Sequence, residues 1–233
     1  MNTNNESSLE NSSLIYDITK FTHLDYPEHL AAIIWFSGCN MRCDYCYNKD
    51  IVFAKNGSIT LREALDFLRS RIGLLDGVVL SGGEATAYNL VEFCQTIKNM
   101  GFAIKLDTNG TYSNNFKQLL DLHLLDYVAL DYKAPKEKFT QITHSRKHDE
   151  FSKTLDLLLT SDIHFEVRTT LHADLLTPHD INAIIDDLVQ RGYDKSYYIQ
   201  EFLETETNIA DLKKASSSFD RAALNNALDI IWR

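Results

Sequence analysis

The feature that most constrains this chain is a group of three cysteines within eight residues. Cys39, Cys43 and Cys46 lie in the loop from Gly38 to Asn48, and the only other cysteine is Cys94. Three thiolates can hold three corners of a cubic iron–sulfur cluster, whereas clusters that only carry electrons normally have four cysteine ligands. The loop therefore predicts a 4Fe–4S cluster with one iron open to a substrate or a cofactor.

A zinc site and three ordinary thiols are the alternatives for this loop. Zinc prefers four ligands, but the nearest histidine is His23, before the loop, and no second cysteine pair follows. Ordinary thiols are not expected to cluster in a chain with four cysteines in 233 residues. The distant Cys94 lies in an expected helix, and we interpret it as a small core residue.

Composition points to one globular domain and disfavours a nucleic-acid or membrane partner. With 233 residues, 44% of them hydrophobic, the chain can bury one substantial core. Its net charge of −10 disfavours a broad nucleic-acid surface. No apolar run approaches the length of a membrane span, and the N-terminus lacks the pattern of a signal peptide. Clustered thiols without an export signal suit a reducing cytoplasm.

Residues 1–13 are rich in Asn, Ser and Glu and are expected to be a disordered tail before a domain at 14–233.

The rest of the chain alternates short apolar runs with helical patterns. Strands are expected at 31–36, 77–80, 102–106, 127–130, 164–170 and 196–199. Helices are expected at 60–72, 89–100, 114–122, 151–160 and 179–191, with a closing helix at 219–232. Six strands fall short of the eight of a closed barrel. The pattern predicts a single α/β domain with a parallel sheet, as in an open (β/α)6 barrel.

Polar residues follow three neighbouring strands where each strand ends. Ser81–Glu84 follow the second expected strand, Asp107–Gly110 the third, and Asp131–Lys133 the fourth. In parallel α/β folds the carboxyl ends of the strands are where active sites form. Taken singly, each motif is more often a turn, an Asx-turn or a solvated lysine. Their common place at one edge favours a functional site.

These motifs resemble those of the radical S-adenosylmethionine (SAM) enzymes. Those enzymes carry a Cys-x-x-x-Cys-x-aromatic-Cys loop, with Tyr45 as the aromatic residue here, and a Gly-Gly-Glu motif one β/α unit later. That motif is Gly82-Gly83-Glu84, followed by Ala85 where the family often has Pro. Residues 16–202 are similar to the activating protein of anaerobic ribonucleoside-triphosphate reductase and, more broadly, to the pyruvate formate-lyase activating enzyme group.

The resemblance implies the residues of the site. Cys39, Cys43 and Cys46 would hold the 4Fe–4S cluster, and Lys133 would pair with the carboxylate of SAM. The implied SAM-binding residues are Tyr45, Tyr47, Gly82, Gly83, Glu84, Asp107, Asn109, Asp131, Lys133 and Arg168. Asp107, Thr108 and Asp131 would also be ligands of a monovalent cation, potassium or sodium, since hard oxygen ligands suit such ions. For Arg168 a structural salt bridge is the alternative.

The resemblance also implies a reaction and its partners. A cluster reduced by flavodoxin or ferredoxin would split SAM into methionine and a 5′-deoxyadenosyl radical, with no catalytic residue beyond the cluster and SAM. The radical would take a hydrogen atom from a glycine of a glycyl radical enzyme, expected to be anaerobic ribonucleotide reductase. No nucleic-acid or membrane partner is expected.

Two alternatives stay open. One is a radical SAM enzyme acting on a small molecule, such as a 7-carboxy-7-deazaguanine synthase. The other is an iron–sulfur redox or sensor protein without SAM turnover, which would not need the motifs after the second to fourth strands.

Overall fold

The computed structural model describes residues 13–233 of an α/β fold with an open, mostly parallel sheet of eight strands. The predicted α/β class and parallel sheet are confirmed. Of the predicted disordered tail at 1–13, residues 1–12 lie outside the described residues. Within residues 13–233, no helix is both long enough and apolar enough to cross a membrane. The chain divides into two compact units.

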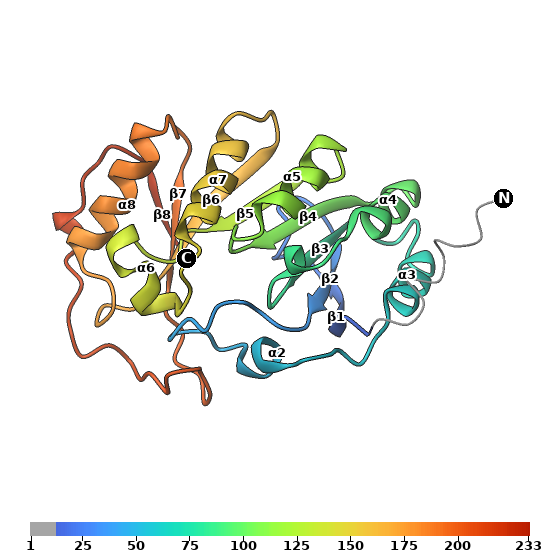
Figure 1. The fold of residues 1–233 in the computed structure, drawn as a ribbon, viewed down its shortest axis with the longest axis horizontal. Coiled ribbons are helices and arrows are strands. Elements are labelled where there is room, and N and C mark those ends of the chain that lie inside the picture. Colours follow the sequence, from blue (N-terminus) through green and yellow to red (C-terminus); the bar gives the residue numbers. More distant parts are fainter. Residues whose placement is uncertain (1–12) are drawn as a thin grey trace. The chain divides into compact units, whose positions relative to one another are not determined.

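The first unit contains residues 13–40, Asp50–Thr108 and Asn114–Val128. Strand β1 runs antiparallel to β2, and β2, β3 and β4 are parallel to one another. Its strands and helices, coloured blue to green in Figure 1, are β1 (Ile15–Thr22), β2 (Ala31–Phe36), α2 (Lys49–Phe53), α3 (Leu61–Arg69), β3 (Gly77–Gly82), the short 3-10 helix η1 (Ala85–Ala87), α4 (Val91–Asn99), β4 (Ala103–Thr108) and most of α5 (Ser113–Asp121).

Apolar packing fixes the strand that leads into the cysteine loop. Five of the six residues of β2 are buried, and the exception, Trp35, is half-buried. On one face, Ala31 and Ile33 pack with Tyr26 and Val79. The ring of Tyr26 lies 2.9 Å from where a side chain on Gly77 would begin, so the start of β3 requires glycine. Burial on both faces explains why this strand reads as a continuous apolar run.

Two predicted helix signals are present in this unit. Helix α3 begins at a capping box in which the side chains of Thr60 and Glu63 bind each other's backbone N–H groups. Helix α4 ends before Gly101, whose φ of +91° is the left-handed conformation expected of a glycine after a helix. In Figure 1, α3 and α4 lie beside each other.

The second unit contains Met41–Lys49, Asn109–Ser113 and Ala129–Arg233. Strands β6, β7 and β8 are parallel and follow in this order. Its elements, yellow-green to red in Figure 1, are the end of β5 (Tyr127–Asp131), α6 (Lys136–Thr143), α7 (His148–Leu159), β6 (His164–Leu171), α8 (Pro178–Gln190), β7 (Tyr197–Glu201), the 3-10 helix η2 (Arg221–Ala223) and β8 (Ile230–Trp232).

The predicted closing helix at 219–232 is wrong. The segment forms η2, an irregular stretch and β8. The N–H of Tyr197 donates to the carbonyl of Asp229 at 2.8 Å, and the N–H of Arg233 donates to Ile199 at 2.9 Å. These bonds satisfy an edge of β7, which a helix would leave open. The adjacent Asn225 and Asn226 also have low helix propensity. Strand β1 and helices α2 and α6 were likewise not expected.

Candidate functional site

The start of the cysteine loop is fastened to the end of β3 in the first unit. Gly38, with a φ of +76°, accepts a hydrogen bond from the N–H of Glu84 at 2.9 Å. A side chain on Gly83 would begin 1.8 Å from the carbonyl oxygen of Gly38. Gly82 has a φ of +112°, and its Cβ would lie 2.5 Å from the backbone of Phe36. Both glycines are therefore required for the close approach that sets the backbone before Cys39.

Glu84 connects the ends of β3 and β4. Its carboxylate is buried and accepts from the hydroxyl of Thr108 at 2.8 Å and from the hydroxyl and N–H of Thr86 at 2.5 and 3.1 Å. Thr108 was predicted as a cation ligand, and its hydroxyl proton is directed to Glu84. The glutamate of the Gly-Gly-Glu motif thus joins the end of β3 to the end of β4 by hydrogen bonds.

Asp107 has a cationic neighbour that the sequence analysis missed. The ammonium of Lys105 lies 2.6 Å from Oδ1, and the hydroxyl of Ser81 donates to Oδ2 at 3.1 Å. The side chain of Lys105 is 3% exposed and that of Asp107 is 15% exposed. Alternation along β4 places residues 105 and 107 on one face, so the spacing contained the signal for this pair.

Cys43 and Cys46 lie in the second unit, in a turn closed by a 2.9 Å hydrogen bond from the N–H of Cys46 to the carbonyl of Cys43. Cys43 is buried and Cys46 is half-buried. Burial raises the pKa of the Cys46 thiol, and the positive charge of Lys133 opposes this rise. The N–H of Arg42 donates to Thr143 at the end of α6 at 2.9 Å, which holds the turn in place. Two thiols close to a cation suit binding as thiolates.

The two predicted tyrosines have different surroundings. Tyr45 is buried, its hydroxyl lies 3.5 Å from the carbonyl oxygen of Lys133, and the ammonium of Lys133 lies 5.9 Å from its ring centre. Tyr47 is 56% exposed. Tyr45 therefore supports Lys133, while Tyr47 has a face open to a planar ligand.

Asp131, Lys133 and Arg168 form one charged group. Asp131 accepts from Lys133 at 2.9 Å and from Nε of Arg168 at 2.7 Å. Burial alone would raise the pKa of Asp131, but the two cations outweigh it and lower the pKa to about 2. The salt bridge considered for Arg168 is confirmed. With two cations to one anion, the group keeps a net positive charge that suits a carboxylate ligand.

Two further residues have local roles. Asn109 is buried and accepts from the N–H and hydroxyl of Thr111 at 3.0 and 2.6 Å, which is an Asx-turn. Cys94 is fully buried in α4, and burial raises the pKa of its thiol to about 12. The interpretation of Cys94 as a core residue is confirmed.

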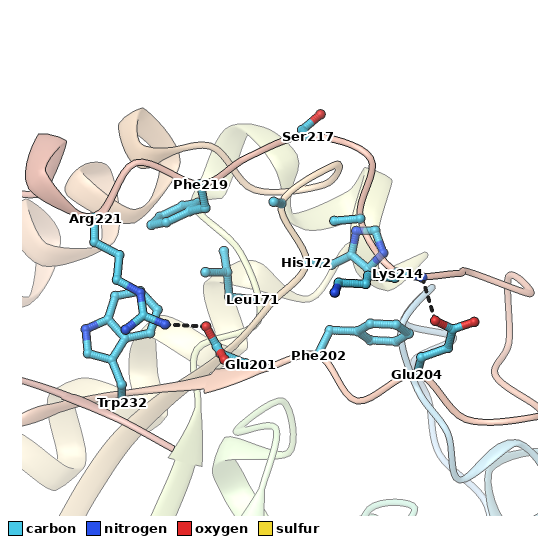
Figure 2. Close-up of a pocket in the computed structure, with 12 residues that line it drawn as sticks. Leu171, His172, Glu201, Phe202, Glu204, Lys214, Ser217, Phe219, Arg221 and Trp232 are labelled. Carbon is cyan, nitrogen blue, oxygen red and sulfur yellow. Dashed lines mark hydrogen bonds and ion pairs between the residues drawn. The ribbon is translucent and has the colours of Figure 1, made fainter.

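A cavity of about 450 Å3 lies at the carboxyl ends of β6 and β7 in the second unit. Figure 2 shows Arg221 paired with Glu201 and lying over Trp232, with its guanidinium carbon 3.8 Å from the ring centre. Opposite them in the view are Phe202 and His172. The cavity can take an apolar or planar group beside charged ones, and sequence reasoning missed it because its walls come from the irregular segment after β7.

The structure brings the predicted residues together in groups within each unit. In the first, Gly82, Gly83 and Glu84 adjoin Gly38 and Thr108; in the second, Tyr45 adjoins Lys133, Asp131 and Arg168. Within residues 13–233, no three His, Cys, Asp or Glu side chains are grouped so that they could hold a metal ion.

Comparison with known proteins gives a family and relatives. The Radical SAM superfamily profile matches residues 33–188. The chain is 29% identical over 228 residues to a protein of Methanocaldococcus jannaschii named as a glycyl-radical enzyme activating enzyme, covering 89% of this chain and 93% of that protein. It is 29% identical over 151 residues to the pyruvate formate-lyase-activating enzyme of Streptococcus mutans, covering 58% of this chain and 57% of that enzyme.

Solved structures share the fold at lower identity. The chain matches native anSMEcpe with bound AdoMet at a TM-score of 0.59 and 18% identity, covering 72% of this chain and 50% of that one. It matches Streptococcus suis SuiB bound to the precursor peptide SuiA at a TM-score of 0.65 and 13% identity, covering 86% and 48%. The chain thus spans about half the length of these structures.

Proposed function

The chain belongs to the radical SAM superfamily, and from this premise we propose that it is an activating enzyme that generates a glycyl radical on a partner enzyme. The observation that carries the proposal is the similarity to a relative of that name along nearly the whole length of both chains. The three-cysteine loop and the polar strand ends contain the residues that we propose for this chemistry.

Cys39, Cys43 and Cys46 are proposed to hold the 4Fe–4S cluster. The donor set fits, because thiolates are the usual ligands of these clusters and Lys133 favours the charged form of the Cys46 thiol. When bound and reduced, the cluster supplies the electron that splits SAM into methionine and a 5′-deoxyadenosyl radical, which takes a hydrogen atom from the partner's glycine. The backbone before Cys39 is held by the hydrogen bond from the N–H of Glu84 to the carbonyl of Gly38.

SAM is proposed to bind through its carboxylate and its adenine ring. Lys133 would bind its carboxylate, with Asp131 and Arg168 fixing the position of that ammonium. The face of Tyr47 would pack on the adenine ring. Gly82, Gly83, Glu84, Asp107 and Asn109 remain predicted SAM-binding residues. For the two glycines, the contacts with Gly38 and Phe36 already provide a structural reason.

The partner is proposed to be anaerobic ribonucleoside-triphosphate reductase, and the electron donor flavodoxin or ferredoxin. The similarity of residues 16–202 to the activating protein of that reductase supports this partner, and it includes the segment Leu24–Pro27 before the first predicted strand and the cysteine loop. A glycine suits the reaction because it has no side chain to obstruct the radical, and the flanking amide groups stabilise a radical at its Cα.

The test is anaerobic mixing of the reconstituted protein, SAM and a reductant with the candidate reductase, followed by electron paramagnetic resonance. A glycyl radical doublet on the reductase, absent when Cys43→Ala replaces the wild type, is the expected result. Turnover of a pterin-derived small molecule, with no radical on the reductase, would instead favour the alternative of a 7-carboxy-7-deazaguanine synthase.

The predicted potassium or sodium ion remains a prediction, and the charges around its expected ligands do not favour it. Asp107 is paired with one cation and Asp131 with two. A monovalent cation is attracted to uncompensated carboxylates, and neither aspartate provides one.

A further inference from the structure

Lys105 is a lysine in a place where lysine is rarely found. It lies in the middle of β4 between Ile104 and Leu106, both fully buried, and is itself 3% exposed. Lysines are almost never buried to this degree without a partner. A strand that contacts parallel neighbours would be stabilised by an apolar residue at this position, so the ammonium group requires a specific reason.

The reason is its contact with Asp107. The ammonium of Lys105 is 2.6 Å from Oδ1, while the hydroxyl of Ser81, on β3, donates to Oδ2 at 3.1 Å. Both carboxylate oxygens thus have a donor from this chain. The ring centre of Tyr127 lies 6.0 Å from the same ammonium, which adds a weak cation–π contact.

We propose that the ammonium of Lys105 supplies, at Asp107, the positive charge that the family resemblance assigns to a potassium or sodium ion. The chain then needs no monovalent cation at this carboxylate. An added ion would face an ammonium already in contact with its intended ligand, and like charges at such distances repel strongly where water is excluded.

Lys105 acts here as a positioning residue. It holds the carboxylate of Asp107, with Ser81, in one orientation at the end of β4, as a bound ion would. The other aspartate named as an ion ligand has its own cations, Lys133 and Arg168. Each aspartate is therefore neutralised inside its own unit.

The test replaces the ammonium by a group of similar length without charge. Apoprotein is melted in KCl and in choline chloride at equal ionic strength, and SAM cleavage by the reconstituted protein is measured in the same two salts. For the wild type, we expect the same melting temperature and the same cleavage rate in both. For Lys105→Met, we expect the melting temperature to rise in KCl only, and cleavage to be at least about fivefold faster in KCl, a coupling of ordinary size.

Three controls keep the test decisive. Lys98→Met removes a lysine that pairs with Asp126 at 2.7 Å near the surface, and it should gain no response to potassium. Lys105→Arg keeps the positive charge, and it should show no response to potassium, as in the wild type. If Lys105→Met does not fold, the double variant with Asp107→Asn removes both charges, and it should fold and ignore potassium.

A wild type whose melting temperature or cleavage rate rises with potassium and saturates would overturn the proposal. So would a folded Lys105→Met that shows no potassium response. The cleavage measurement rests on the proposed function, whereas the melting measurement does not. A protein that cleaves no SAM in any salt would therefore count against the proposed function and leave the melting result interpretable.

Discussion

The carbonyl oxygen of Gly38 lies where a side chain on Gly83 would begin, 1.8 Å from the position of its Cβ. The N–H of the next residue, Glu84, donates to the same oxygen at 2.9 Å. These two backbone contacts join the start of the cysteine loop to the end of β3. Gly83 stays a predicted SAM-binding residue, and its close contact with Gly38 is a structural reason for glycine at this position.

Gly83→Ala should displace the cysteine loop. The added methyl group meets backbone on Gly38, which cannot rotate away as a side chain could, so either β3 or the loop must move. We expect a lower melting temperature and less iron per chain after anaerobic reconstitution. Gly73→Ala is the control, since its Cβ meets no atom within 4 Å and costs only the left-handed strain of roughly 1–2 kcal/mol. Equal iron content in the two variants would contradict the prediction.

Three of the four cysteines should be cluster ligands, and the fourth, Cys94, should not. Cys39→Ala, Cys43→Ala and Cys46→Ala are each expected to lose most of the about four irons of a cubic cluster. Cys94→Ala should retain the iron, because Cys94 is fully buried in α4 with its thiol protonated. Iron assays and the visible absorption of the reconstituted proteins measure this. Loss of the cluster in Cys94→Ala, with normal folding, would mean that the fourth iron is not open.

The sequence predicted the strands that are buried on both faces and missed those at the edges. β2 is buried on both faces, and such a strand requires a continuous apolar run that can be recognised in the sequence. β1 carries Asp17 and Lys20 on a half-exposed edge with an irregular register, so it has no strict alternation to detect. β8 forms because β7 offers it hydrogen-bonding partners, and such a nonlocal cause leaves no mark in the local residues that form β8.

The candidate site shows the same division. The positions of Asp107, Asp131 and Lys133 follow from the strand ends on which they lie. Their partners do not, because pairing depends on which strands are neighbours: Arg168 reaches Asp131 from another strand. Lys105 is the exception, since its place two residues before Asp107 on one strand could have been read directly.

Lys133→Gln should weaken SAM binding. The variant keeps much of the side-chain length but removes the charge that we propose to bind the SAM carboxylate. A hydrogen bond to a charged group is worth roughly 1.5–3 kcal/mol, so the dissociation constant should rise about ten- to a hundredfold. Equilibrium dialysis with the reconstituted protein measures it. Lys153→Gln, at an exposed pair with Glu150, is the matched control and should bind SAM normally. Unchanged affinity in Lys133→Gln would remove this residue from the proposed site.

His148 should make the apoprotein less stable in mild acid. Its ring packs edge-on against Phe139 with centres 5.1 Å apart, and within the described residues neither ring nitrogen has a hydrogen-bond partner. Burial, and then the charge of Lys136, lower the pKa of this histidine. The folded state therefore resists a proton that the unfolded chain accepts near its ordinary value of about 6.5. Stability from this residue is complete above that pH and falls as the pH drops below it.

His148→Phe should therefore lose less stability than the wild type between pH 8 and about pH 5.5, a range that spans the ordinary histidine pKa. Urea unfolding of the apoprotein at the two values gives the free energies, and the difference between proteins cancels the titration of carboxylates that they share. The phenyl ring keeps the edge contact with Phe139 and cannot take a proton. His164→Gln, at an exposed histidine on β6, is the control for removing a histidine from the chain. An equal drop in wild type and His148→Phe would show that the ring is protonated as readily in the folded chain as in the unfolded one.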